Sequence, residues 1–214
     1  MGKLLVDITT SLDGYVAGPN QTLEDPLGAG GMRLHEWAFA AAAWREAHGL
    51  AGGEASADSD VVQEGVDRTG ATIMGRRMFS GGSGPWADDP NANGWWGDEP
   101  PFGHPVFVLT HHDREPLELK GTTFTFATGG IEPALEQARA AAGDEDVLVA
   151  GGGSAAEQYV AAGLVDELQI HLVPLFLGDG VRLFERLGAS PPELEQVRVI
   201  SSPTVTHLRY RVLR

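Results

Sequence analysis

The chain has 214 residues, of which 42% are hydrophobic and none is cysteine. The absence of cysteine excludes a disulfide framework, a thiol nucleophile and a thiolate metal site. Thirty acidic and 15 basic residues give a formal net charge of −15, which repels nucleic acid and anionic lipid, so we expect neither as a partner.

One substantial hydrophobic core is ordinary for this length, and no internal repeat or linker divides the chain. We therefore predict a single domain over residues 1–214. No apolar stretch approaches about 18 residues, and the N-terminal residues lead directly into a predicted strand without a cleavable hydrophobic region. These features predict a cytoplasmic protein without a membrane-spanning segment.

Apolar segments rich in β-branched residues predict eight strands, and amphipathic segments between the earlier ones predict four helices. The strands are expected at 3–9, 71–74, 106–110, 123–127, 147–150, 168–173, 194–201 and 205–213, and the helices at 34–47, 58–68, 133–142 and 155–162. Alternating strands and helices are typical of an α/β fold in three layers, with a central, mostly parallel sheet between helices. The last two strands have no helix between them and predict a C-terminal antiparallel hairpin.

Two of these segments indicate which side faces the core. Leu34, Trp37, Ala41 and Trp44 lie on one stripe of the first predicted helix, which we expect to be buried. In the last strand, apolar residues alternate with basic ones that include His207, so we expect that strand to be half exposed.

Three consecutive glycines follow the predicted strand at 147–150, whose unbroken apolar sequence is expected of a strand buried on both faces. Ser154 is a suitable N-cap for the next helix, so Gly151, Gly152 and Gly153 lie at a helix N-terminus. Unpaired amides and the helix dipole favour negative charge there, and residues without Cβ atoms let a diphosphate approach the backbone. The alternative is a tight connector that needs the dihedral angles of glycine.

Two long irregular segments interrupt the pattern, at 11–31 and 80–105. Long ordered loops are usually functional, and the second contains Trp86, Trp95 and Trp96, which argue against disorder. This loop forms either a wall over an apolar ligand or a cover for its own core or for a partner subunit.

Basic and hydroxyl side chains gather at the ends of two predicted strands, where ligands bind in open α/β sheets. They are Gly75-Arg76-Arg77 after one strand, and Thr110, His111 and Arg114 at the end of the next. With the glycines holding a diphosphate, these groups suit a ribose phosphate, which favours NADPH over NADH. Alternatively, the arginines are surface charges paired with nearby acids.

The histidines do not predict a metal site, because adjacent His111 and His112 lack metal-ligand spacing and no histidine-carboxylate cluster occurs. His35, His171 and His207 are expected to be structural. No GxSxG or Walker pattern is present, so neither a hydrolase nor an NTPase is predicted.

Six segments in order along nearly the whole chain resemble the dihydrofolate reductase-like superfamily. They are SLDGYVAG from Ser11, MGRRMF from Met74, VFVLT from Val106, AGGGS from Ala150, GLVDEL from Gly163 and VPLFLGDG from Val173. The branch most similar to them is the reductase (C-terminal) domain of the bifunctional riboflavin-biosynthesis deaminase-reductase. Residues 26–37 resemble a stand-alone bacterial subfamily.

The resemblance implies a dihydrofolate reductase-like fold, NADPH as hydride donor and a homodimer. It places the nicotinamide near the first strand and the loop from Asp13 to Gly18. It places the diphosphate over Gly151–Ser154, with a cis peptide bond between Gly151 and Gly152. The 2′-phosphate is implied to lie near Arg76, Arg77, Thr110 and His111 of the two basic clusters. Gly75 and Met78, which flank the two arginines, are implied to bind the cofactor as well.

Departures from the family pattern concern the substrate. The biosynthetic reductases resemble one another in a lysine and an acid where this chain has Asp7 and Ala150. Folate reductases resemble one another in a carboxylate on the first helix, for which the nearest candidate here is Glu36 in a different local motif.

Hydride transfer also requires a proton and a dry pocket. Asp13 and Glu36 are the candidate proton donors, provided that burial raises one of their pKa values. Alternatively, neither residue is catalytic: Asp13 serves only as a turn residue before Gly14, and Glu36 lies on the solvated face of its helix. Trp37, Trp86 and Phe102 are candidates for the wall around a small-molecule substrate.

The predicted function is an NADPH-dependent oxidoreductase that reduces a small heterocyclic or carbonyl compound. One alternative is a riboflavin-biosynthesis reductase of the 5-amino-6-(5-phosphoribosylamino)uracil reductase type. The other is an NADPH-binding module without catalysis.

Overall fold

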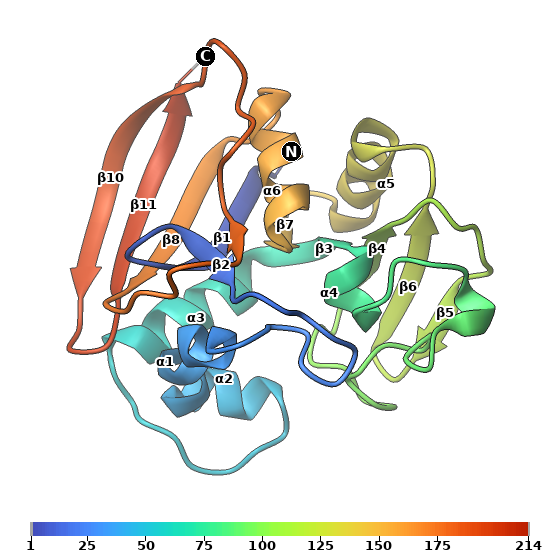
Figure 1. Cartoon of the computed structure of the whole chain (residues 1–214), viewed down its shortest axis with the longest axis horizontal. Helices are drawn as coiled ribbons and strands as arrows, with labels where there is room; N and C mark the ends of the chain where they lie inside the picture. Colours follow the sequence, from blue (N-terminus) through green and yellow to red (C-terminus); the bar gives the residue numbers. More distant parts are fainter. Residues whose placement is uncertain (1, 214) are drawn as a thin grey trace.

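A computed structural model describes residues 2–213 and shows an α/β fold built on a nine-stranded sheet (Figure 1). The strands are β1 Leu4–Ser11, β2 Tyr15–Ala17, β3 Thr69–Gly75, β4 Val106–Leu109, β5 Leu117–Leu119, β6 Thr122–Ala127, β7 Asp146–Gly151, β8 Glu167–Val173, β9 Val181–Arg182, β10 Glu193–Ser201 and β11 Thr206–Leu213. The helices are η1 Gly31–His35, α1 Glu36–Ala40, α2 Ala42–Ala47, α3 Ala57–Arg68, α4 Arg76–Ser80, η2 Trp86–Asp88, α5 Ile131–Ala142 and α6 Gly153–Ala161.

The strand order of the main sheet is β10-β11-β8-β1-β7-β3-β4-β6-β5. The six strands from β8 to β6 are parallel, whereas β5, β10 and β11 are antiparallel to their neighbours. All eight predicted strands are present, so the mostly parallel sheet with its C-terminal hairpin is confirmed. The sequence missed β2, β5 and β9, because two or three residues carry no measurable alternation.

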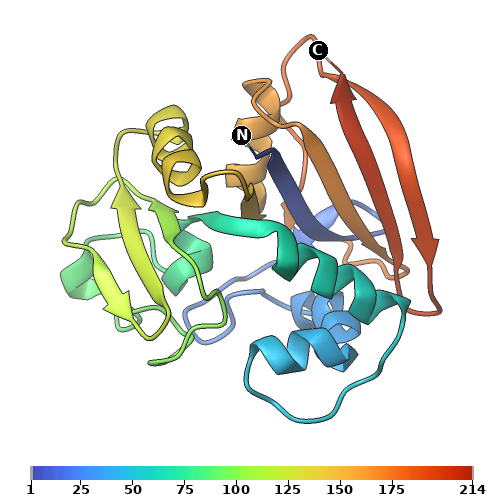
Figure 2. The same ribbon diagram turned by 180° about the vertical axis from the view of Figure 1, so that it is seen from behind.

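Helices cover both faces of the sheet. The largest core lies between the sheet and α5 and α6, where Val6, Ile73, Val149 and Tyr159 are buried. On the opposite face, α1 and α3 pack against β1, β8 and β11, and α3 passes in front of the sheet in Figure 2. The carboxyl ends of β1, β3, β4 and β7 therefore meet at one edge between the two helical layers.

The single helix predicted over 34–47 is wrong. The chain forms η1, α1 and α2 instead, and Ala41 between the last two is extended, with φ −69° and ψ 133°. Here the backbone leaves the helix to pair with Glu54, which accepts the N–H of Ala42. The predicted apolar stripe is nevertheless correct, because Leu34, Trp37 and Ala41 are buried.

Two expectations about the glycine segment also need correction. Ser154 is not the N-cap of α6, because the helix begins at Gly153 and Gly152 occupies the cap position. The strand before it is not buried on both faces, since Val147 and Val149 are buried but Leu148 and Ala150 are half-buried. The face of β7 that carries Leu148 and Ala150 is therefore not fully covered.

The tryptophan loop packs on its own core. Trp86 and Trp96 contact the aromatic side chains of Phe79, Phe124 and Phe126, and Trp95 donates its indole N–H to the carbonyl of Met78 at 2.8 Å. The loop thus forms the outer wall of the sheet at β4 and β6.

Candidate functional site

The glycine segment lies at the carboxyl edge of the sheet, next to the start of α4. A Cβ atom placed on Gly75 would lie 3.7 Å from the Gly152 nitrogen, and one on Gly151 would lie 3.2 Å from the Met78 sulfur. The structure therefore brings Gly75, Met78, Gly151 and Gly152 together. The peptide bond between Gly151 and Gly152 is cis, as the family resemblance implied.

This glycine corner is open on the side where a ligand would approach. Gly152 and Ser154 are exposed, and nothing lies within 4 Å of a Cβ placed on Gly152. Gly153 is different, because a Cβ there would lie 2.9 Å from Val16 Cγ2, so β2 packs directly on it. The amides of Ala155 and Ala156 donate to the Gly152 carbonyl at 2.9 and 3.2 Å, so those of Gly153 and Ser154 are the first-turn amides that a helix N-terminus offers to an anion.

A second group of residues forms a positively charged pocket at the ends of β3 and β4. The guanidinium of Arg76 lies 3.5 Å from the centroid of the Trp86 ring, and Arg114 lies 4.8 Å from the same ring. Arg76 is buried and forms an ion pair with Asp89 at 2.5 Å, yet its Nε and Nη1 atoms have no hydrogen-bond partner. Two arginines against one carboxylate leave this pocket with a net positive charge.

The pKa shifts in this pocket fit a fixed ion pair. Burial opposes ionisation of Asp89, but the Ser80 hydroxyl and the Arg76 guanidinium lower its pKa below the ordinary value. Burial also lowers the pKa of Arg114, and the positive charge of Arg76 lowers it further. An arriving anion would relieve the repulsion between Arg76 and Arg114.

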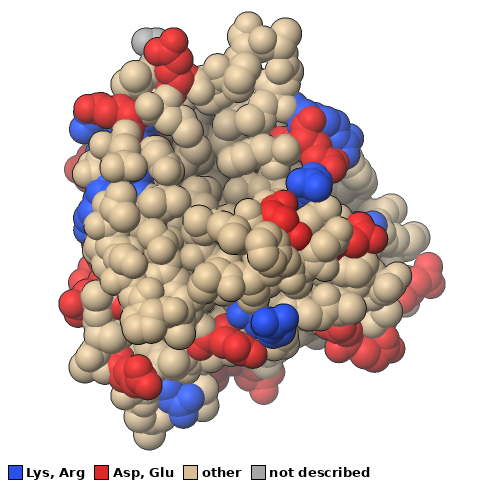
Figure 3. Space-filling view, turned by 60° about the vertical axis from the view of Figure 1, so that its left-hand side comes forward, with Lys and Arg blue, Asp and Glu red and all other residues tan. Residues whose placement is uncertain are grey.

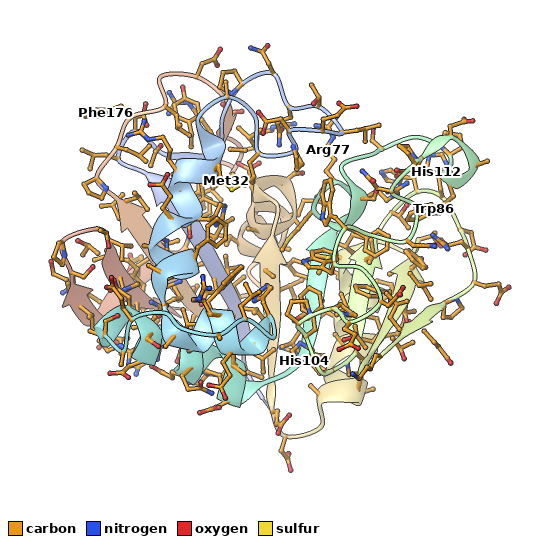
Figure 4. All side chains as sticks on the ribbon, turned by 90° about the horizontal axis from the view of Figure 1, so that it is seen from below. Met32, Arg77, Trp86, His104, His112 and Phe176 are labelled. Atoms are coloured by element: carbon orange, nitrogen blue, oxygen red, sulfur yellow. The ribbon has the colours of Figure 1, made fainter. Side chains whose placement is uncertain are left out.

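The other predicted phosphate ligands are placed differently. Thr110 is buried and its hydroxyl accepts the N–H of His112 at 3.1 Å, whereas His111 is exposed. Arg77 is exposed and lines an open cleft of about 360 Å³ between residues 21–26 and 81–89. Figure 4 shows Arg77, Trp86 and His112 at the same end of the molecule.

The structure gives Asp13 a role in holding loops rather than in donating a proton. Its carboxylate accepts from the Ser11 hydroxyl at 2.6 Å and from the N–H groups of Leu177 and Gly178 at 3.2 and 2.8 Å. These hydrogen bonds, the one from Ser11 above all, lower the pKa of Asp13. The expectation of a raised pKa is therefore wrong for this residue.

Gly18 lies in tight backbone packing, because a Cβ there would lie 2.1 Å from the carbonyl oxygen of Ala29. Its lack of a side chain is required by this crossing of two loops. It is buried by the chain itself.

The predicted wall residues do not lie together. Glu36 is exposed on α1, while Trp37 is buried between α1 and the sheet. Phe102 packs against Trp96 and His104, and Figure 4 places His104 at the opposite end from Arg77 and Trp86. Trp86 and Phe102 both belong to the aromatic cluster around Phe79 and Phe124, whereas Trp37 lies in a separate cluster on the α1 side of the sheet.

Sequence reasoning missed a buried chain of polar side chains on the α3 side of the sheet. Asp7, His171, His207 and Asp58 are joined by three hydrogen-bond contacts of 2.6, 2.6 and 2.9 Å. His207 is 1% exposed, although it shares a face of β11 with Arg209 and Arg211. Only the adjacency of β1, β8 and β11 brings these residues together, so no local sequence pattern could have revealed the chain.

Residues 2–213 offer neither a membrane-spanning helix nor a cluster of metal ligands. No helix in this range is both long and apolar enough to cross a membrane. No group of three or more histidine, cysteine or acidic side chains in it is placed to hold a metal ion.

Comparison with known proteins gives one family. A family model described as the RibD C-terminal domain matches residues 2–208. A search of curated proteins found no match.

Several solved structures share the fold. One from Shewanella sp. PV-4, described as a protein of riboflavin biosynthesis, is 21% identical with a TM-score of 0.64, over 99% of both chains. A deaminase/5-amino-6-(5-phosphoribosylamino)uracil reductase from Thermotoga maritima is 13% identical with a TM-score of 0.57, and RibD from Acinetobacter baumannii is 18% identical with a TM-score of 0.55. The matches include 99% and 100% of this chain but only 57% and 58% of those two proteins.

Proposed function

Because the chain belongs to the RibD C-terminal domain family, we propose that it is an NADPH-dependent reductase of a pyrimidine intermediate of riboflavin biosynthesis. Membership in this reductase family makes it an enzyme, which argues against a binding module without catalysis. The broader prediction of a reductase for a small heterocyclic or carbonyl compound includes this reaction. The riboflavin-pathway alternative receives the better support.

The observation that carries the proposal is the pairing of the open glycine corner with the arginine pocket. A diphosphate needs amides that side chains do not obstruct, and Gly152 and Ser154 at the start of α6 offer such a surface. A phosphate monoester needs a fixed cation, and Arg76 is fixed by Trp86 and Asp89 with two nitrogens left unpaired. A dinucleotide with a 2′-phosphate, NADPH, has both groups.

In this mechanism, bound NADPH supplies the hydride. Arg76 and Arg114 would hold its 2′-phosphate, and the first turn of α6 would hold the diphosphate. Arg77, Thr110 and His111 are the further phosphate ligands that the family resemblance implies. The substrate would lie over the half-buried face of β7 that carries Leu148 and Ala150.

The substrate contacts differ from those of the biosynthetic relatives. By the family resemblance, Asp7 and Ala150 stand where those reductases have a lysine and an acid, so charged substituents of the pyrimidine would meet different groups here. We therefore include related pyrimidines, pterins and simple carbonyl compounds in the substrate panel.

We also propose that residues 1–214 act as one domain and that the enzyme is a homodimer. Support for the dimer comes from β10, the outer strand of the sheet, where Leu194, Val197 and Val199 are between 45 and 48% exposed. Figure 3 brings the hairpin side forward and shows a broad uncharged area with most charged side chains around its margin. An open edge strand with apolar side chains favours pairing with a second copy.

The test is the oxidation of NADPH by the purified enzyme with 5-amino-6-(5-phosphoribosylamino)uracil as acceptor, followed by absorbance of the reduced nicotinamide. We expect turnover with NADPH and much slower turnover with NADH. Turnover only with other members of the panel would replace the substrate but keep the reductase. No binding of NADPH in a fluorescence titration would contradict the whole proposal.

A further inference from the structure

The buried polar chain runs through four side chains from three strands and one helix. Nε2 of His171 lies 2.6 Å from Asp7 Oδ1, and Nε2 of His207 lies 2.9 Å from Asp58 Oδ1. Between them, the two Nδ1 atoms lie 2.6 Å apart. Each of these contacts is short enough for a hydrogen bond.

The sheet fixes this arrangement. His171 of β8 and His207 of β11 are direct cross-strand partners, and Thr9 of β1 is the partner of His171 on the other side. Trp37 covers both imidazoles, with ring centroids 4.6 and 5.0 Å from theirs. Both imidazoles are thereby removed from water, and their hydrogen bonds must be made within the chain.

The polar chain formed by Asp7, His171, His207 and Asp58 holds one proton more than two neutral histidines would supply. A hydrogen bond needs one proton between its two atoms, so three contacts need three protons. Two neutral imidazoles supply only two. The third proton makes one imidazole cationic or one carboxylate neutral, and without it two nitrogen lone pairs would face each other at 2.6 Å.

The surroundings disfavour placing this third proton on His207. Burial lowers the pKa of His207, which disfavours its cationic form despite the nearby Asp58. Burial and the neighbouring His171 lower the pKa of His35 to about 4. His35 is therefore neutral at neutral pH and places no positive charge beside the polar chain. The other ionisable groups packed around the chain pair among themselves: Glu64 with Arg209 and Arg68, and Glu167 with Lys3 and Arg68.

Asp7 is the end of the chain that reaches the candidate substrate face. Its side chain is 32% exposed, against 11% for Asp58 at the other end. Leu5 and Val6 of β1 pair with Leu148 and Val149 of β7, and Asp7 lines the same small cavity as Leu148. Gly152 at the open corner follows the last residue of β7.

We propose that Asp7 is the catalytic acid of the reduction and that His171, His207 and Asp58 are positioning residues that hold its proton. The assignment rests on the proposed function. It replaces Asp13, whose hydrogen bonds keep it ionised, as the proton donor.

The hydride brings two electrons to the acceptor carbon, forms a C–H bond and breaks the π bond of a C=O or C=N group, while the nicotinamide is oxidised. The His171 Nε2 proton passes to Asp7, and Asp7 gives it to the oxygen or nitrogen of the acceptor. After the transfer, the four side chains of the polar chain keep two of their three protons. The third is replaced by a proton that Asp7 takes from water.

Kinetics of three variants test the assignment. Asp7→Asn keeps the shape of the side chain but cannot pass on a proton, so we expect kcat to fall on the order of 10²-fold with NADPH affinity unchanged. His207→Leu removes the acceptor that shares the His171 proton, so the loss of kcat at alkaline pH should begin at lower pH. His104→Gln is the matched control, because His104 is a half-buried histidine bonded to Thr72 at the other end of the strands.

A second measurement does not depend on turnover. In the free protein at neutral pH, histidine labelled with ¹⁵N should show a scalar coupling between the two Nδ1 nuclei and a strongly deshielded proton between them, both absent in His207→Leu. An Asp7→Asn enzyme with wild-type kcat and pH profile would overturn the assignment, as would two neutral imidazoles without that coupling. If the wild type reduces nothing in the panel, the proposed function fails, and the nuclear magnetic resonance result alone decides whether the chain holds its third proton.

Discussion

Arg76 and Asp89 form an ion pair in the phosphate pocket, and the sequence predicted Arg76 but not its partner Asp89. Asp89 accepts from Ser80 and from the N–H of Asn91, so it is itself fixed when it meets Arg76 at 2.5 Å. A buried arginine that is held on one side and unpaired on the other is prepared for an anion. This pairing gives Asp89 a positioning role that no motif indicated.

The first prediction concerns the choice of cofactor. Arg76→Ala should weaken NADPH binding by about 1.5 to 3 kcal/mol, roughly ten- to a hundredfold in Kd, because a charge-assisted hydrogen bond to the 2′-phosphate is lost. NADH, which lacks that phosphate, should be affected far less. Fluorescence titration measures both, with Arg211→Ala on the distant hairpin as control, and an equal loss for both cofactors would contradict the placement of the phosphate.

The second prediction concerns acid stability. The folded-state pKa of Asp13 lies below its unfolded value, so its ionised form stabilises the fold above the unfolded value, and this stabilisation is lost as pH falls through the folded value. Asp13→Asn should therefore lower Tm at neutral pH, with the difference from wild type shrinking below about pH 4. Ser11→Ala removes the main donor, so its loss should begin at higher pH. A difference between wild type and Asp13→Asn that is constant over pH would contradict this account.

At the scale of elements, α6 combines two demands in its first residues. Gly153 must lack a side chain because β2 packs on it, whereas Gly152 and Ser154 face solvent. The helix is thus fixed by packing at one residue and left open for an anion at its neighbours. A substitution of Ser154 by an acidic residue therefore distinguishes the stability of the helix from its ability to bind an anion.

Ser154→Asp should leave Tm unchanged or raise it, because a carboxylate in the first turn of a helix gains about 0.3 to 1 kcal/mol from the helix dipole. The same carboxylate should repel the diphosphate and weaken NADPH binding at least about tenfold. Ser154→Ala is the matched control and should change neither quantity much. Unchanged NADPH affinity in Ser154→Asp, measured by titration beside a thermal melt, would move the diphosphate away from this corner.

At the scale of the whole molecule, the outer edge of the sheet decides how copies associate. Lysine on an edge strand opposes pairing, so Val199→Lys on β10 should convert the proposed dimer to a monomer. Val66→Lys on α3 is the control, since Val66 is 49% and Val199 is 48% exposed. Sedimentation velocity gives the mass of each, and a wild-type monomer at all concentrations, or an intact Val199→Lys dimer, would contradict the edge model.

The sequence by itself determined the eight longer strands, the hairpin and the glycine corner, whereas the cis peptide bond there was implied only by the family resemblance. These features depend on neighbours along the chain: alternation of apolar residues, the length of connections, and glycine after a buried strand. The sequence did not predict the break in the helix at Ala41, because that break depends on pairing with Glu54, which is distant in sequence.

Only the tertiary structure decided the partners of the functional side chains. The strand order places β11, β8 and β1 side by side, so Asp7 meets His171 across 164 residues and His207 meets Asp58 across 149. The same order separates Phe102 from Trp37 and leaves one face of β7 half covered. Chemistry at this site depends on which strands lie next to each other, and local sequence patterns carry no information about that order.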